Sequence, residues 1–270
     1  MSSQRRAGNT PHQAGAPAWD AAESDQRAAD RDTPHSTEID HGIAMGAAGW
    51  DFSVLAPVFD SHIHRSIPLT DESREYIAAL SRFFLDEGST VYELGTSTGR
   101  LAERVLAANH AIDCRYIGLD SAEDMVDAAN RYLEADPRFR AHAADITDCS
   151  FAPTPLVLSH YTLHFVPLEP RRQLLARVHE ALDGGGALIL YEKVRSADPS
   201  IEQMLAALYD EYKLASGFNR QQIDNKRALL SGVLQPLTRD QNLELLREAG
   251  FRRIELIHHF HCFEGYLAIK

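Results

Sequence analysis

The sequence predicts an α/β fold with a mostly parallel, seven-stranded sheet, an antiparallel C-terminal strand and a helical insertion. Strand-like apolar runs alternate with amphipathic helical segments over residues 91–193, as in sheets whose crossovers are helices. The run 187–191 is apolar at every position, which is typical of a strand buried on both faces of a parallel sheet. Near the C-terminus, Glu264-Gly265 separates the strand-like segments 254–263 and 266–269, which predicts an antiparallel pair joined by a tight turn.

The strands before the C-terminal pair are short apolar runs followed by polar or small residues. They cover residues 91–94, 116–119, 155–159 and 187–191, and a further strand-like segment ends at 145. A leading helix is expected over residues 76–85. Ser121 with Asp124 predicts a capping box for the helix after the second strand. The glycines at 184–186 are expected to end the helix that carries Leu174, Leu175, Val178 and Leu182.

Residues 196–235 are predicted to form a helical insertion after the fifth strand. Six apolar residues recur there at spacings of three and four and so share one helix face: Ile201, Met204, Leu205, Leu208, Tyr209 and Tyr212. Core packing is the simpler interpretation of that face, and substrate lining is the alternative. A second helix carries Ile223, Arg227 and Leu230. Thr238 with Gln241 is expected to cap the following helix.

Composition limits the possible classes of protein. The 270 residues, 44% of them hydrophobic, suit one domain with an appendage. No apolar run approaches the roughly 20 residues that span a bilayer, so no membrane contact is expected. Three scattered cysteines fit a reduced, cytoplasmic protein. A net charge of −12 without a basic cluster argues against direct nucleic-acid binding.

The N-terminal segment differs from the rest of the chain. Residues 1–42 contain no Leu, Val or Phe. Such a segment buries too little apolar area to offset the entropy lost on ordering. We therefore predict a disordered tail over residues 1–42 and a folded domain over 43–270.

The most informative segment is the end of the first strand and the turn that follows it. The strand ends in an acidic residue, and the turn consists of the small residues 95–99. Glycines at 95 and 99 carry no Cβ and are expected to let a ligand approach the backbone. Asp120, at the second strand end, is placed to take both hydroxyls of a ribose, and Asp145-Ile146 to contact an adenine. Together they predict an adenosine-containing ligand. The spacing departs from the G-x-G-x-x-G of dinucleotide sites and favours S-adenosylmethionine (SAM).

A set of stretches in the folded region carries a resemblance to a known family. They are Gly49-Trp50-Asp51-Phe52, Phe59 through Arg65-Ser66-Ile67-Pro68, Tyr92-Glu93-Leu94-Gly95-Thr96-Ser97, Tyr161-Thr162-Leu163-His164-Phe165, Glu192-Lys193, Gly217-Phe218 and Asn225-Lys226-Arg227. In these stretches the chain resembles the carboxy-S-adenosylmethionine synthases and their relatives, over residues 49–270. The resemblance implies the class I SAM-methyltransferase fold, which is Rossmann-like.

In that family SAM reacts with prephenate, and the SAM methyl group, as an ylide, captures the departing carboxylate. The resemblance implies that Arg227 holds the new carboxylate across a dimer interface, which suits a guanidinium because it forms two parallel hydrogen bonds. It also implies that Arg65 meets the carboxylate of SAM or of an acidic substrate. The residues expected to bind SAM are Arg65, Glu93, Gly95, Thr96, Ser97, Gly99, Asp120, Ser121, Met125, Asp145, Ile146 and His160.

Three positions depart from the family pattern. Leu69-Thr70 stands where a tyrosine is expected shortly after Pro68, His160 stands in place of an asparagine near the sulfonium, and Thr96 replaces a cysteine. The first two changes surround the reacting methyl group. They favour a relative that keeps the SAM pocket and runs different chemistry.

His160, Glu192 and Arg227 are the candidate catalytic residues. SAM is already an activated electrophile, so methyl transfer depends mainly on holding the nucleophile in line. His160 is a candidate base because histidine titrates near neutral pH; a strand-end histidine bonded to backbone is the alternative. Glu192 is a candidate to take a substrate ammonium or hydroxyl, unless it pairs with Lys193 or a helix amide.

The sequence thus predicts a cytoplasmic, homodimeric SAM-dependent methyltransferase that acts on a small, carboxylate-bearing molecule. One alternative is carboxy-SAM synthesis from SAM and prephenate. Others are cyclisation of SAM to a cyclic amino acid and methylthioadenosine, and SAM binding without turnover. No metal site is expected, because residues alternate across a strand and split the set His258, His259, His261 and Cys262 between two faces.

Overall fold

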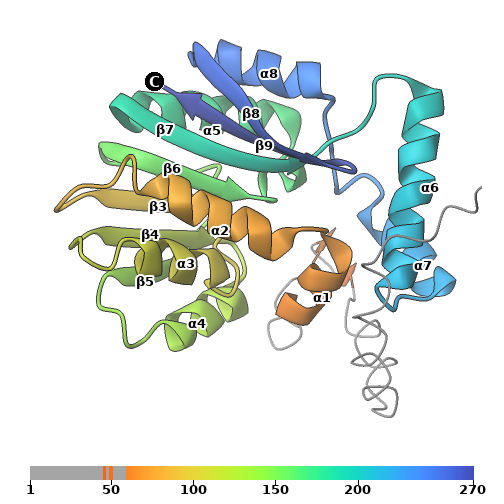
Figure 1. Ribbon diagram of the computed structural model, residues 1–270, viewed down its shortest axis with the longest axis horizontal. Coiled ribbons are helices and arrows are strands. Elements are labelled where there is room, and N and C mark those ends of the chain that lie inside the picture. The colour runs from red at the N-terminus through yellow and green to blue at the C-terminus, as the bar shows by residue number, and fades with distance from the viewer. Residues whose placement is uncertain (1–44, 47–48, 51–58) are drawn as a thin grey trace, which may run out of the picture. The chain divides into compact units, whose positions relative to one another are not determined.

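The computed structural model describes residues 45–46, 49–50 and 59–270 (Figure 1). Two short strands, β1 (Met45–Gly46) and β2 (Gly49–Trp50), pair in antiparallel fashion. The tail predicted over residues 1–42 lies outside the described residues. So do residues 51–52 of the Gly49-Trp50-Asp51-Phe52 stretch.

The central sheet has seven strands, as the sequence predicted. They are β3 (Thr90–Leu94), β4 (Arg115–Asp120), β5 (Phe139–Ala143), β6 (Thr154–His160), β7 (Leu182–Lys193), β8 (Arg253–Phe260) and β9 (Phe263–Ile269). Their order in the sheet is β5-β4-β3-β6-β7-β9-β8. Strands β3 to β7 are parallel, and β9 is antiparallel to both β7 and β8. The strand order reverses between β3 and β6, where ligands of such sheets bind.

Helices cover both faces of this sheet (Figure 1). On one face lie α2 (Thr70–Ser81), α3 (Arg100–Ala108) and α4 (Glu123–Tyr132), and on the other α5 (Leu168–Ala181) and α8 (Arg239–Glu248). The side chains of β6 alternate between the two layers. Leu156 and Leu158 pack on the α2 side, while Val157 packs on the α5 side. Among the described residues, no helix has the length and apolarity needed to cross a membrane.

The segment between β7 and β8 contains two further helices, α6 (Pro199–Ala215) and α7 (Arg220–Leu230). Helix α6 contacts α1 (Phe59–Ser66) through a 2.7 Å hydrogen bond that the Tyr209 hydroxyl donates to the Ser66 carbonyl. The prediction that the apolar face of α6 packs in the core is wrong for three of its residues. Ile201, Met204 and Leu208 are 48%, 64% and 49% exposed, because only one side of α6 faces the domain.

Several predicted boundaries are wrong in detail. The leading helix begins at Thr70 rather than 76. Ala122, not Ser121, occupies the N-cap of α4, and Asp120 accepts the hydrogen bond from its amide. The glycines at 184–186 lie within β7, where a bulge interrupts pairing with β6.

The C-terminal turn also differs from the prediction. Glu264 and Gly265 lie inside β9, and the chain turns at His261 and Cys262 instead. A Cβ on Gly265 would lie 2.6 Å from the ring of Tyr191, on the neighbouring strand β7. The glycine is therefore needed for close packing between strands rather than for a turn.

Candidate functional site

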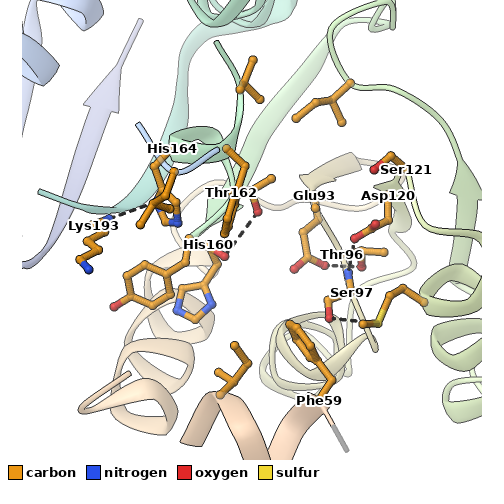
Figure 2. Close-up of a pocket in the computed structure, with 18 of the residues that line it drawn as sticks. Phe59, Glu93, Thr96, Ser97, Asp120, Ser121, His160, Thr162, His164 and Lys193 are labelled. Carbon is orange, nitrogen blue, oxygen red and sulfur yellow. Dashed lines mark hydrogen bonds between the residues drawn. The ribbon is translucent and has the colours of Figure 1, made fainter. Parts of the chain in front are cut away.

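A cavity of about 580 Å³ lies at the carboxyl ends of β3, β4, β5 and β6, within the size range of small-molecule sites. Residues from α1 and α7 complete its wall, among them Ile63 and Leu230. The residues predicted to bind SAM that line the cavity are Glu93, Gly95, Thr96, Ser97, Asp120, Ser121, Met125, Asp145, Ile146 and His160 (Figure 2). The structure thus brings together side chains from four strand ends.

The turn after β3 depends on two glycines that pack closely against protein side chains. Gly95 and Gly99 have φ of 80° and 82°, in the left-handed region that favours glycine. A Cβ on Gly95 would lie 2.2 Å from Thr162 Oγ1, and one on Gly99 would press on Leu133. Both glycines therefore make room for protein side chains, and Gly95 also lines the cavity. Gly99 itself caps α3 and lies outside the lining that the described residues form.

Glu93 is a buried carboxyl group at the end of β3. Its Oε2 accepts hydrogen bonds from Thr96 Oγ1 (2.7 Å) and from the Tyr116 hydroxyl (2.9 Å). Burial raises the pKa of Glu93 to about 7, although both hydrogen bonds and the positive charge of Arg74 oppose that rise. Near neutral pH the group is thus poised between its charged and neutral forms.

Asp120, at the end of β4, connects its strand to the turn after β3. Its Oδ2 accepts a 2.9 Å hydrogen bond from the Ser97 amide, and its Oδ1 accepts one of 3.0 Å from the Ala122 amide. Burial raises the pKa of Asp120, and the hydrogen bonds from backbone amides oppose that rise. Each carboxylate oxygen has more than one acceptor site, so the group retains capacity for ligand hydroxyls.

The third strand end supplies one polar and one apolar wall. Asp145 is exposed, and its Oδ1 accepts hydrogen bonds from the amide and the hydroxyl of Thr147 at 2.8 and 2.7 Å. Ile146 is buried beside it. On the opposite side, Ser97 Oγ lies 3.8 Å from Met125 Sδ. Apolar surfaces with a few placed polar groups are typical of sites for a flat, nitrogen-containing ring.

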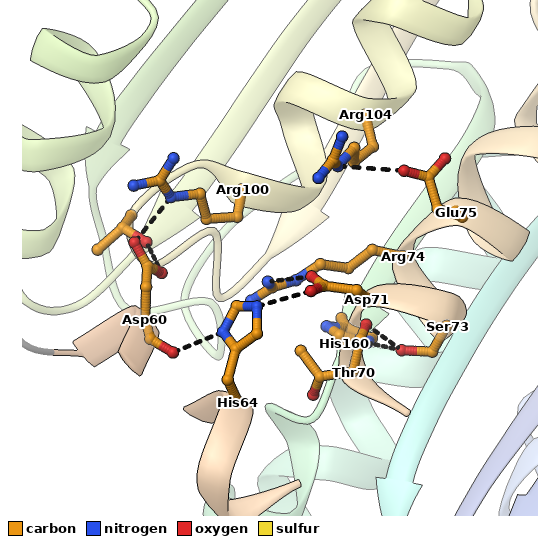
Figure 3. A network of polar contacts seen from close by, with 11 residues as sticks. Asp60, His64, Thr70, Asp71, Ser73, Arg74, Glu75, Arg100, Arg104 and His160 are labelled. Atoms are coloured by element: carbon orange, nitrogen blue, oxygen red, sulfur yellow. Dashed lines mark hydrogen bonds and ion pairs between the residues drawn. The ribbon is translucent and has the colours of Figure 1, made fainter. Parts of the chain in front are cut away.

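His160, at the end of β6, is held by a side chain rather than by backbone. Its Nε2 lies 2.8 Å from Ser73 Oγ, and that hydroxyl donates its proton to the Thr70 carbonyl (Figure 3). The Ser73 oxygen therefore accepts from His160, which assigns the proton to Nε2 and leaves Nδ1 as an acceptor. Burial, and then Arg74 and His258, lower the pKa of His160 well below its ordinary value, so the ring is neutral.

Four predicted site residues lie outside the cavity lining formed by the described residues: Arg65, Gly99, Glu192 and Arg227. The guanidinium of Arg65 stacks on Phe218, 4.7 Å from the ring centroid. Glu192 is 1% exposed and faces His164 Nδ1 (3.5 Å) and Arg171 Nη1 (3.9 Å) instead of Lys193. Arg227 pairs with Asp210 and Asp224 and is 55% exposed.

Sequence reasoning missed several basic residues that line the cavity, among them His62, Arg74, Lys193 and Lys226. Burial, then Lys226 and Arg65, lower the pKa of His62 to about 3. Two of these residues could have been found from the sequence, because each is adjacent to a predicted site residue. Lys193 follows Glu192 in a strand, where neighbours point to opposite faces, and Lys226 directly precedes Arg227.

No set of three or more His, Cys, Asp or Glu side chains with the arrangement of a metal site occurs in the part of the chain that the structure describes. Tyr161 and Ser97 have positive φ of 62° and 49°, and both line the cavity. Non-glycine residues in this region are strained, and such strain is concentrated at functional sites.

Comparison with known proteins identifies relatives along most of the chain. A methyltransferase-domain family matches residues 91–186. The carboxy-S-adenosyl-L-methionine synthase of Staphylococcus epidermidis is 30% identical over 226 residues, which are 82% of this chain and 97% of that protein. The synthase of the same name from Pseudomonas putida is 34% identical over 73% of this chain and 83% of its own.

Among solved structures, the SAM-dependent methyltransferase SibL in its apo form superposes with a TM-score of 0.58 at 18% identity. The superposition covers 86% of this chain and 64% of SibL. At that identity it shows a shared fold. The two synthases align at higher identity and over most of their own length, which confirms the resemblance seen in the sequence. The chain belongs to the carboxy-S-adenosyl-L-methionine synthase family of SAM-dependent transferases.

Proposed function

We propose that the protein binds SAM together with a small, carboxylate-bearing second substrate. The observation that carries this proposal is the distribution of charge around the cavity. Its carboxyl groups, Glu93, Asp120 and Asp145, lie at or just after the ends of β3, β4 and β5, where SAM is expected. Figure 2 shows Asp120 on one side of the cavity and Lys193 on the other.

The side away from the nucleoside is basic. Lys193 Nζ lies 4.8 Å from the centroid of the Tyr209 ring, and Lys226 Nζ contacts His62 and lies 3.5 Å from Ser66 Oγ. Lysine is a compact cation that pairs readily with an anion. A cavity that already holds the positive sulfonium of SAM, and adds two ammonium groups, favours an anionic partner over a cationic or neutral one.

Carboxyl capture by the SAM methyl group is the first candidate reaction. The relatives are named for the synthesis of carboxy-SAM, and Arg227 stands where the family resemblance places a carboxylate clamp. In this reaction prephenate loses its carboxyl carbon as carbon dioxide, and its hydroxyl leaves as water with the proton that the SAM methyl group gives up. The deprotonated methyl carbon then bonds to the carbon dioxide. The basic side of the cavity would hold the prephenate carboxylate next to the methyl group before the new bond forms.

Methyl transfer to a carboxylate-bearing acceptor is the second candidate, and His160 is the observation that favours it. The ring is neutral, its Nε2 donates to Ser73, and its Nδ1 remains an acceptor. A group of this kind accepts a proton from an acceptor hydroxyl as the methyl group is transferred. The resemblance predicts an asparagine at this position, and an asparagine lacks that capacity.

A homodimer forms part of this proposal. Arg227 lies outside its own cavity, and the exposed apolar residues Ile201, Met204 and Leu208 lie on the neighbouring helix α6. If α6 and α7 contact a second copy of the chain, Arg227 can reach the cavity of that copy. An apolar patch covered in this way also avoids the cost of exposure to water.

Mass spectrometry of the reaction products tests the proposal. Purified protein is incubated with SAM alone, with SAM and prephenate, and with SAM and a panel of small carboxylic acids. Carboxy-SAM in the prephenate sample supports the first candidate. S-adenosylhomocysteine that appears only with a carboxylic acid supports the second. Methylthioadenosine from SAM alone contradicts the need for a second substrate. No conversion in any sample contradicts turnover with prephenate and with the tested acids.

The variant His160→Asn separates the two candidates further. It restores the residue that the resemblance predicts, so carboxy-SAM formation should persist in it. Methyl transfer that uses His160 as the base should fall at least about a hundredfold, as expected for loss of a general base. A methyl-transfer rate equal to that of the unaltered protein would remove His160 from the mechanism.

A further inference from the structure

Arg74 is a buried cation that the family resemblance does not predict. It lies on α2 and lines the cavity with only 6% of its surface exposed. Figure 3 shows its guanidinium close to Asp71, one turn of helix beyond Thr70 and beside the Ser73–His160 contact. The resemblance places residue 70 near the reacting methyl group, and Arg74 lies one helical turn beyond it. The amino-acid end of SAM is therefore expected beside Arg74.

The guanidinium is poorly satisfied by the residues around it. Its Nη1 lies 3.4 Å from Asp71 Oδ1, but that carboxylate is 47% exposed and also pairs with His64 at 2.7 Å. Its buried Nε has no hydrogen-bond partner among the residues that the structure describes. A guanidinium carries five N–H donors, and a buried charge without good partners is costly. A further acceptor is therefore expected.

Glu93 is the nearby carboxyl group in the lining, and it compensates Arg74 only in part. Its Oε2 accepts hydrogen bonds from Thr96 and Tyr116 rather than from Arg74. The positive charge of Arg74 still lowers the pKa of Glu93 against the effect of burial, so the two groups interact. One acidic and one basic group thus line the same cavity and interact electrostatically.

We propose that Arg74 binds the α-carboxylate of the amino-acid moiety of SAM, with Glu93 taking the adjacent ammonium. An α-amino acid carries one charge of each sign on neighbouring atoms, and this pair of side chains is complementary to it. A guanidinium holds a carboxylate with two parallel hydrogen bonds. This assignment gives Arg74 one of the two roles that the resemblance implied for Arg65, which stacks on Phe218 outside the lining. It leaves Lys193 and Lys226 for the second substrate.

Isothermal titration with two ligands tests the assignment. Decarboxylated SAM differs from SAM only in the missing α-carboxylate. The unaltered protein should bind SAM at least about tenfold more tightly than decarboxylated SAM, as expected for a hydrogen-bonded charge pair. Arg74→Gln should lose this preference by weakening SAM binding alone. An equal loss for both ligands, or a preference that survives in Arg74→Gln, would overturn the assignment.

Three further variants keep the test decisive. Arg104→Gln removes a guanidinium that pairs with Glu75 at 3.3 Å on the outer side of α2, and it should keep the preference. Arg65→Gln should keep it as well, and its loss there instead would assign the carboxylate to Arg65. Arg74→Lys covers the case in which Arg74→Gln fails to fold; it should show a weakened preference, because an ammonium cannot form two parallel hydrogen bonds. The readout is binding, so it stands even if the proposed reactions are not observed.

Discussion

Glu93 combines a buried position with a pKa of about 7, raised by desolvation. Close to neutral pH a fraction of the molecules therefore carries a proton on this group. A bound cation favours the ionised carboxylate and lowers its pKa. If the ammonium of SAM lies against Glu93, binding must displace that proton, and the affinity must depend on pH.

We expect the affinity for SAM to fall as the pH decreases below about 7, by up to about tenfold per pH unit. The sign follows from the raised pKa, because below it the free protein is protonated and binding must release a proton. Between pH 5.5 and 7 the α-amino group of SAM stays mostly protonated and contributes little. Titrations in buffers of different ionisation enthalpy measure the proton release directly.

The variant Glu93→Gln is the control for this dependence. Its side chain keeps a similar shape but does not titrate, so SAM binding should become weaker and nearly independent of pH over this range. A pH dependence unchanged in Glu93→Gln would assign the titration to another group. Asp120, whose pKa is also raised by burial, would then be the next candidate.

At this scale the sequence predicted the acidic half of the site and missed the basic half. Glu93, Asp120 and Asp145 lie at the ends of predicted strands, and parallel strands bring their carboxyl ends to one edge. Arg74 and Lys226 are on helices, far from the strand ends in sequence. Their approach to the cavity depends on how α2 and α7 pack, which local patterns do not encode.

Among the elements, α8 is a helix whose start was predicted correctly from its capping residues. Thr238 Oγ1 accepts from the Gln241 amide (3.2 Å), and Gln241 Oε1 accepts from the Thr238 amide (3.0 Å), which confirms the predicted capping box. Thr238→Ala should lower the free energy of unfolding by about 1 kcal/mol. Urea denaturation measures this change, and Thr238→Ser should retain most of the stability. An unchanged midpoint in Thr238→Ala would show that α8 does not depend on its cap.

Glycines mark the elements where prediction failed. At Gly265 and at residues 184–186, the sequence suggested turns, whereas the structure places these residues in β9 and β7. A glycine in an apolar segment is equally consistent with a turn and with close approach of a neighbour. At Gly265 the structure shows close approach, because the ring of Tyr191 packs against it. The two residues are 74 positions apart in sequence, so local patterns do not reveal this contact.

For the whole molecule, the alternation of strands and helices was sufficient to predict the sheet, because each crossover must pack on one of its faces. The surface of α6 was not predictable in the same way. The spacing of its apolar residues predicts that they share one face of the helix, but it does not predict which part of the protein, or which other chain, covers that face. In the single chain that face is largely exposed, and Arg227 beside it is paired only with Asp210 and Asp224 in the described region. Both features point outward, as expected for an interface between two copies.

Complementation between subunits tests whether Arg227 acts in the cavity of a partner. Arg227→Ala keeps its own cavity but lacks the clamp, whereas Asp120→Ala keeps Arg227 but loses the predicted ribose contact. Each variant alone should be nearly inactive with SAM and prephenate. Dimers obtained by co-expressing the two should recover activity, because one of their two sites combines an intact cavity with an Arg227 from the other chain.

Arg220→Ala is the matched control for this experiment. Arg220 is on the same helix and also pairs with Asp210, at 3.2 Å, but it is more exposed than Arg227. If pairing with Asp210 is the important function of Arg227, then Arg220→Ala should reduce activity too. Full activity of Arg227→Ala alone would contradict the proposal that Arg227 holds the carboxylate. Inactive mixed dimers would instead indicate that Arg227 acts in the cavity of its own chain. Helices α6 and α7 would then have to move toward that cavity.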